Sequence, residues 1–286
     1  MKMETLQEQT ERLTQHPVVS RDEWLTARRA LLKQEKELTD RMDAIAEARR
    51  ALPWVRVTKP YRFAGPENAA LTLSDLFAGN SQLFVYHFMF APDWSEGCDG
   101  CSFIADHFDG PNLHLKHHDV SVVAVSRAPL AKLSAYKKRM GWHFPWYSSA
   151  DSDFNYDYNA SFTADQVAAG KAVYNFEPLS EAEFGGMTEL PGMSVFYKDG
   201  TGAIFHTYST YARGGDILLG ANNILDMTPK GRNERTIMSW VRRHDQYEAE
   251  AAERKCCSSA AAAPKAETAT PEPVAAGESN DSCCRS

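Results

Sequence analysis

Cys98 and Cys101 are the residues whose type and spacing most directly suggest chemistry. They flank Asp99 and Gly100 at a point where an apolar strand pattern has ended and a helical pattern begins. The free N–H groups at a helix N-terminus favour negative charge, so they would stabilise a Cys98 thiolate. Such a thiolate attacks a disulfide, and Cys101, one helical turn further on, closes the new disulfide. Asp99 places negative charge beside Cys98, so we expect a nucleophile less acidic than that of strongly oxidising dithiols.

The same cysteines also fit a zinc-finger spacing, Cys98-x2-Cys101-x12-His114-x3-His118. A finger of this kind needs a helix that leads into the histidine pair, and Gly110-Pro111 would break that helix. We therefore predict no metal site and no cofactor, with the histidines exposed at a helix-to-strand junction.

The elements that must position the cysteine pair follow from hydrophobic periodicity. Continuous apolar runs indicate buried strands, and an amphipathic pattern that ends at Gly141 indicates a helix. The order is βαβα followed by ββα, which predicts an α/β fold: a mixed sheet flanked by helices. We expect strands at 82–90, 120–125, 146–148, 194–197 and 203–208, helices at 102–108, 130–140 and 216–225, and loops at 91–100 and 151–162.

A long N-terminal helix precedes this domain, with a capping box formed by Ser20 and Glu23. Apolar residues recur in it every seven positions: Trp24, Leu31, Leu38, Ile45 and Leu52. The helix is either an arm packed along its own domain, which we favour, or a coiled-coil contact between two copies in a homodimer. We divide the chain into a helical arm (1–52), an α/β domain (53–244) and a C-terminal tail (245–286).

The C-terminal tail is rich in Ala, Pro, Ser, Thr and Glu and has few large apolar residues. It cannot bury enough surface to offset chain entropy, so we predict disorder. Adjacent cysteines, Cys256/Cys257 and Cys283/Cys284, would deliver electrons to the dithiol, capture a soft metal ion, or have no function.

Charge and hydropathy restrict the partners and the compartment. The net charge of −7 argues against nucleic-acid binding and against docking on anionic lipid. The longest apolar run, Leu83–Pro92, is too short to span a membrane, and Met1–Thr14 lacks the apolar core of a signal peptide. We therefore expect a cytoplasmic protein without membrane or nucleic-acid partners, in which cysteines are reactive more often than they form structural disulfides.

Five strings of the sequence are distinctive: YHFMFAPDWSEGCDGCSF (86–103), VAVSRAPL (123–130), KRMGWHFPW (138–146), DFNYD (153–157) and FHTYSTYARG (205–214). Through them the chain resembles, over roughly residues 18–243, an uncharacterised bacterial family of thioredoxin-like proteins, and its element order is similar to the peroxiredoxin-like branch.

The resemblance implies a thioredoxin-like fold with Cys98 as nucleophile and Cys101 as resolving thiol. It also implies substrate binding by Trp94 and by Pro191, the candidate for a cis-proline that faces the dithiol. The chain departs from the thioredoxin pattern in two respects. Gly97, not Trp, directly precedes Cys98, and Pro191 lies slightly early relative to the strand that follows it.

The expected function is thiol–disulfide oxidoreduction, with a protein or small-molecule disulfide as substrate and a cellular thiol as reductant. One alternative is a thioredoxin-fold binding or scaffold protein for a soft metal or a protein partner. The other is a peroxiredoxin-like peroxidase, for which Ser95 has the required offset from Cys98 while Pro92 is one residue too close.

Overall fold

The computed structural model describes residues 5–66, 70–179 and 185–247. One compact unit comprises Met1–Asp245, and a second comprises Gln246–Ser286. Nearly all of the second unit lies outside the described residues. The predicted disorder of the tail and its two cysteine pairs, Cys256/Cys257 and Cys283/Cys284, therefore stay untested.

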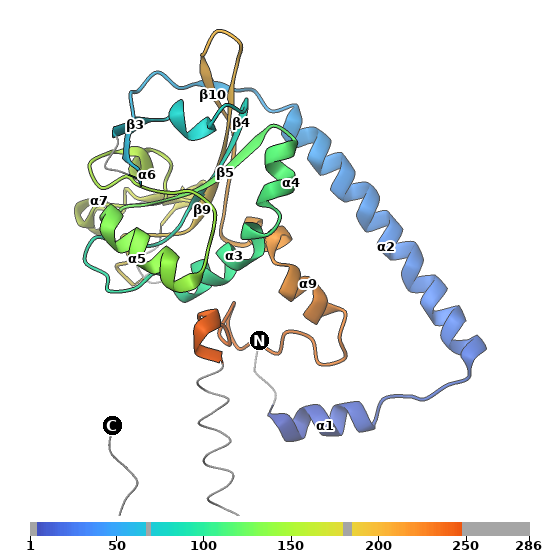
Figure 1. Ribbon diagram of the computed structural model, residues 1–286. Helices are drawn as coiled ribbons and strands as arrows, with labels where there is room; N and C mark the ends of the chain where they lie inside the picture. Colours follow the sequence, from blue (N-terminus) through green and yellow to red (C-terminus); the bar gives the residue numbers. More distant parts are fainter. Residues whose placement is uncertain (1–4, 67–69, 180–184, 248–286) are drawn as a thin grey trace, which may run out of the picture. The chain divides into compact units, whose positions relative to one another are not determined.

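One mixed sheet organises the first unit (Figure 1). Its strands are β1 (Val55–Arg56), β2 (Arg62–Ala64), β3 (Ala70–Thr72), β4 (Gln82–His87), β5 (Val120–Ser126), β6 (Trp146–Ser148), β9 (Gly192–Lys198) and β10 (Ile204–Tyr211). Their spatial order is β1-β10-β9-β4-β5-β6-β2-β3. Strand β4 runs parallel to β5 and antiparallel to β9, and β5 runs parallel to β6. A separate short hairpin pairs β7 (Val173–Tyr174) with β8 (Glu177–Pro178).

The helices precede, connect and follow these strands in the chain. They are α1 (Leu6–Thr14), α2 (Arg21–Arg50), α3 (Asp99–Asp109), α4 (Asn112–His117), α5 (Leu130–Met140), α6 (Phe154–Asp157), α7 (Ala164–Ala168) and α9 (Gly220–Asp226), with 3-10 turns η2 (Asp75–Phe77), η3 (Ala212–Leu218) and η4 (His244–Gln246). The order β4-α3-β5-α5-β6 followed by β9-β10-α9 confirms the predicted thioredoxin-like α/β arrangement.

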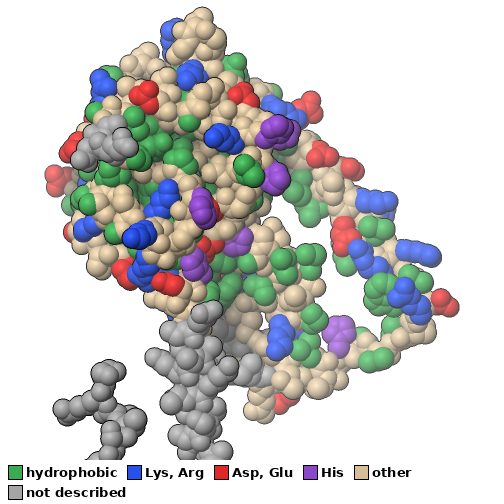
Figure 2. Space-filling view, in the orientation of Figure 1, with side chains coloured by type: hydrophobic (Ala, Val, Ile, Leu, Met, Phe, Trp, Pro, Cys, Tyr) green, Lys and Arg blue, Asp and Glu red, His purple; other side chains and the backbone are tan. Residues whose placement is uncertain are grey.

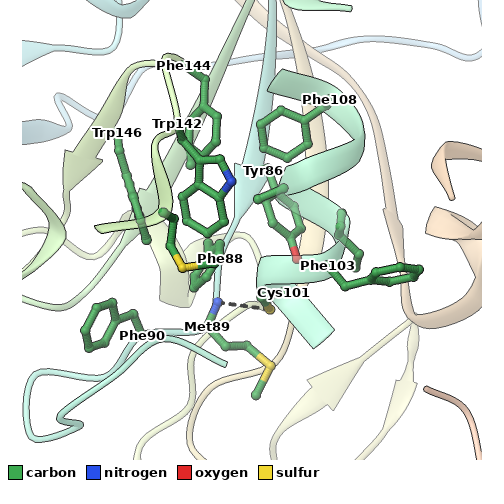
Figure 3. Packing of buried hydrophobic residues seen from close by; sticks show 14 of the residues in the cluster. Tyr86, Phe88, Met89, Phe90, Cys101, Phe103, Phe108, Trp142, Phe144 and Trp146 are labelled. Carbon is green, nitrogen blue, oxygen red and sulfur yellow. Dashed lines mark hydrogen bonds between the residues drawn. The ribbon is translucent and has the colours of Figure 1, made fainter. Parts of the chain in front are cut away.

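Alternation along β4 divides the core between the two faces of the sheet. Leu83 and Val85 point into a cluster with η2 and with Phe154 of α6. Tyr86 belongs to the opposite cluster, which α3, α5 and the segment after α9 complete. Aromatic rings dominate this second cluster (Figure 3), which is the one that contains Cys101.

The observed element boundaries differ from the predicted ones at several places. Helix α5 occupies its predicted range and ends at Gly141, whose φ of 67° favours glycine. Helix α3 begins at Asp99 instead of Ser102, so it includes Cys101. The strand expected over 82–90 ends at His87. The Phe88 N–H still donates to the Val125 carbonyl oxygen, and the Met89 N–H donates to the Cys101 sulfur instead of to a neighbouring strand. The expected loop 151–162 contains α6, and the closing helix is divided into η3 and α9.

Helix α2 buries none of its residues. The four apolar residues of the stripe that lie on α2 stay exposed, from 46% at Trp24 to 59% at Leu38. Hydrophobic side chains lie among the charged ones along this helix in Figure 2. The favoured interpretation, an arm packed along its own domain, is therefore wrong. In the described part of the chain, no helix has both the length and the apolar character to cross a membrane.

The alternative, a homodimer through α2, stays a prediction. We expect full-length protein to sediment as a dimer and the double variant Leu31→Glu/Leu38→Glu to sediment as a monomer, because two buried carboxylates in each copy would oppose helix pairing. Thr26→Glu, on the opposite side of the same helix and also exposed, is the matched control. A monomeric wild-type protein would contradict this prediction.

Candidate functional site

Cys98 is the N-cap residue of α3, with φ −59° and ψ 138°. Its own N–H donates to the Met89 carbonyl oxygen at 3.2 Å, which fixes the segment that leaves β4. Cys101 lies one helical turn further on, in the first turn of the helix. Both residues are free thiols; Cys98 is partly exposed, whereas Cys101 is buried. The structure therefore places the two cysteines at a helix start, as the sequence predicted.

The Cys98 thiolate is stabilised by neighbouring donors. A hydrogen bond from the Cys101 side chain lowers the pKa of Cys98 to about 7, and the backbone N–H groups of Cys101 and Gly100 act in the same direction. Burial and the charge of Asp99 oppose this effect. The predicted unfavourable influence of Asp99 is confirmed in direction, and at neutral pH a large fraction of Cys98 is nevertheless a thiolate.

Cys101 is the opposite case. Burial, followed by the neighbouring Cys98 sulfur, raises the pKa of Cys101 well above its ordinary value. The Met89 N–H donates to the Cys101 sulfur at 3.4 Å (Figure 3), which favours the thiolate. The pair thus consists of an accessible thiolate and a buried thiol, which is the division of labour that disulfide exchange needs.

Arg243 holds the start of α3 from a distant part of the chain. Its Nη2 donates to the Gly97 carbonyl oxygen at 2.7 Å and pairs with Asp99 at 2.8 Å. Its Nε donates to the Tyr136 hydroxyl at 2.8 Å, and its Nη1 lies 3.0 Å from a Glu96 carboxylate oxygen. The guanidinium offsets the Asp99 charge beside Cys98 and ties the segment after α9 to the dithiol loop.

Two glycines of the site have crowded surroundings. A Cβ at Gly97 would lie 2.7 Å from the Phe88 ring and 3.0 Å from the Tyr136 ring. A Cβ at Gly100 would lie 3.1 Å from the Met238 sulfur and 4.0 Å from the Cys98 sulfur. The absence of Trp before Cys98 therefore has a steric reason, and Met238 is the side chain that lies over the middle of the dithiol loop.

Pro191 and Trp94, the predicted substrate-binding residues, lie near the same end of the sheet. Pro191 directly precedes β9, whose Gly192 pairs with His87 at the end of β4. All peptide bonds of the described residues are trans, so the prediction of a cis-proline at Pro191 was wrong. The Tyr174 hydroxyl donates to the Pro191 carbonyl at 2.8 Å, which holds this segment without a cis bond.

Trp94 is partly buried and packs against the core cluster that contains Cys101. The Lys132 ammonium group donates to the carbonyl oxygens of Trp94 and Pro92, at 2.9 and 2.7 Å, and so ties their loop to α5. Substrate binding by Trp94 and Pro191 stays a prediction.

The histidines of the zinc-finger spacing lie on α4 and directly after it. His114, His117 and His118 are exposed, as predicted. Helix α3 ends before Gly110, and α4 begins after Pro111, so the helix break is confirmed. Within the three described ranges, no three His, Cys, Asp or Glu side chains come together as metal ligands.

Sequence reasoning missed three residues of the site: Tyr86, Met238 and Arg243. Tyr86 carried a signal, since a tyrosine inside a buried strand needs a partner for its hydroxyl. Arg243 carried none, because it lies 146 positions from Gly97 in the sequence. Only the packing of the segment after α9 against α3 brings Met238 and Arg243 to the dithiol.

Known proteins that are similar to this chain share little of its sequence. No curated protein is similar enough to count as a match. Among solved structures, the chain is similar to the peroxidoxin BcpB from Mycobacterium tuberculosis, with 13% identity, a TM-score of 0.40, and coverage of 59% of this chain and 94% of that one. It is also similar to a cysteine-to-serine mutant of PrxQ from Xylella fastidiosa, with 12% identity, a TM-score of 0.37, and coverage of 57% and 88%.

A family model described as a bacterial protein of unknown function matches residues 13–247. This match spans the whole α/β domain, including the dithiol, and most of the N-terminal arm. It confirms the resemblance to an uncharacterised bacterial family. The chain therefore belongs to the DUF899 family of bacterial proteins.

Proposed function

We propose that this protein is a thiol–disulfide oxidoreductase that uses Cys98 and Cys101. One observation carries the proposal: the Cys98 sulfur, at the N-cap of an eleven-residue helix, is stabilised by backbone N–H groups and by a buried second thiol. A structural cysteine gains nothing from a lowered pKa, whereas a nucleophile with a pKa near the ambient pH has a large reactive thiolate fraction.

The reaction consists of two exchanges. The Cys98 thiolate attacks one sulfur of a substrate disulfide, a mixed disulfide forms, and the first substrate thiolate leaves and takes a proton. Cys101 then loses its proton and attacks the Cys98 sulfur, which releases the second substrate thiolate and leaves a Cys98–Cys101 disulfide. The substrate gains two electrons, and a cellular thiol reductant restores them to the protein.

Replacing Cys98 with Ser tests this proposal. We expect reduction of insulin, or of a small disulfide, to fall to the uncatalysed rate in Cys98→Ser. In the wild-type protein, the rate of Cys98 alkylation should rise with pH through about 7, because the thiolate is the reactive form. Serine replacement of the four tail cysteines is the control and should preserve activity. Equal activity in wild type and Cys98→Ser would exclude the oxidoreductase.

The same proteins distinguish the two alternatives. Turnover of a hydroperoxide in place of a disulfide, lost in Cys98→Ser, would favour a peroxidase. An inert dithiol together with stoichiometric binding of a soft metal, measured by equilibrium titration with and without the tail, would favour a binding protein.

A further inference from the structure

The Tyr86 hydroxyl is a buried polar group with no evident structural task. Tyr86 is fully buried in β4, and its ring packs edge-on against Phe88 and Phe108, with centroids 5.9 and 5.5 Å away. Its hydroxyl makes no well-aligned hydrogen bond with any described residue. A buried hydroxyl without a partner costs about 1–3 kcal/mol, and phenylalanine would fill the same space without that cost.

The hydroxyl is directed at the dithiol. In Figure 3 it points from β4 toward Cys101. The proximity of Cys101, after burial, contributes to a Tyr86 pKa well above its ordinary value. The phenol therefore stays protonated and keeps a proton that it can donate in a hydrogen bond.

We propose that the Tyr86 hydroxyl donates a hydrogen bond to the Cys101 sulfur when Cys101 becomes a thiolate in the closing step of disulfide exchange. This inference rests on the proposed function. Together with the Met89 N–H, the phenol gives the buried thiolate two donors, which partly replace the water that burial removes.

Other nearby hydroxyls are already engaged. Tyr136 contacts the Ser102 hydroxyl and accepts from Arg243. Tyr174 donates to the Pro191 carbonyl and accepts from the Ala212 N–H. Tyr86 is thus the tyrosine whose hydroxyl is available to Cys101 in the reduced state.

The closing step needs such a donor. Cys101 must release its proton before it attacks the Cys98 sulfur, and burial opposes that release. A donor that lowers the pKa of Cys101 increases the thiolate fraction at neutral pH. The proton that Cys101 loses passes to solvent and balances the proton that the first substrate thiolate takes up. The proton that Cys98 lost on ionisation balances the one that the second substrate thiolate takes up.

Tyr86→Phe tests the donor with an aromatic disulfide whose released thiolate absorbs visible light. In protein whose four tail cysteines are replaced by Ser, the first release reports attack by Cys98, and the second reports closure by Cys101. If loss of the donor raises the pKa of Cys101 by about one unit, the thiolate fraction of Cys101 falls about tenfold. The more basic thiolate attacks about threefold faster, so closure should slow by about threefold and depend on a higher pH range.

The reference is the protein with the four tail cysteines replaced by Ser. The rate of the first release should be the same in Tyr86→Phe as in this reference. The thermal midpoint of Tyr86→Phe should equal or exceed that of the reference. Tyr61→Phe, which removes another buried hydroxyl from the opposite face of the sheet, is the matched control and should close at the reference rate. Closure of Tyr86→Phe with the reference rate and pH dependence would overturn the inference while leaving the oxidoreductase intact. Absence of a second release in the reference protein would overturn both.

Discussion

A Cys101→Ser variant is expected to accumulate a stable mixed disulfide between Cys98 and its substrate. The variant retains the helix N-terminus, and the backbone N–H groups continue to stabilise the Cys98 thiolate. It lacks the second thiol that closes the disulfide. An intramolecular partner held one helical turn away is replaced by external thiols, so turnover should fall by at least about a hundredfold. Mass spectrometry of the intact protein measures the adduct directly.

The position of the adduct decides the interpretation. Peptide mapping should find the substrate on Cys98 and not on the four tail cysteines, and a reducing agent should release it. Cys98→Ser, treated in the same way, should carry no adduct in the dithiol segment. Turnover of Cys101→Ser at the wild-type rate would show that Cys101 does not resolve the intermediate.

An Arg127→Ala variant is expected to lose much of its folding stability. Arg127 lies directly after β5, and its Nη1 is 2.6 Å from the Glu189 carboxylate. Glu189 is 1% exposed and also accepts from the Ser161 hydroxyl at 2.6 Å. Removing Arg127 leaves a buried carboxylate without its counter-ion, which costs about 3–5 kcal/mol. Chemical denaturation at neutral pH measures the free energy of unfolding.

Acidification should reduce the stability that Arg127→Ala loses relative to the wild-type protein. Burial already raises the pKa of Glu189 in the folded protein, and the loss of Arg127 raises it further. A carboxyl group with a raised folded pKa binds its proton more tightly in the native state, so native stability increases as pH falls through that pKa. The difference between the variant and wild type should therefore shrink toward acidic pH.

Two variants control this experiment. Arg213→Ala breaks an ion pair with Asp216, and because the Arg213 side chain is 69% exposed, this should cost at most about 1 kcal/mol. Adding Glu189→Gln to Arg127→Ala removes the unpaired charge and should restore part of the stability. Equal losses in Arg127→Ala and Arg213→Ala would mean that burial of the pair has no energetic weight.

The sequence by itself determined the dithiol, its place between a strand and a helix, and the thioredoxin-like order of elements. These features depend on local spacing. Apolar runs define β4 and β5, apolar residues that recur every seven positions define α2, and Gly141 ends α5. Residues close in sequence have few conformations available, so periodicity and turn residues suffice to predict them.

The tertiary structure decided which side chains surround the dithiol and how Pro191 is held. Arg243 and Met238 reach Cys98 because the chain after α9 packs back on α3, and Tyr86 faces Cys101 because of its register within β4. The Tyr174 hydroxyl secures a trans Pro191, and α2 leaves exposed the stripe that we expected it to bury. Contacts between distant segments depend on how whole faces fit together, and no local pattern of residues encodes that fit.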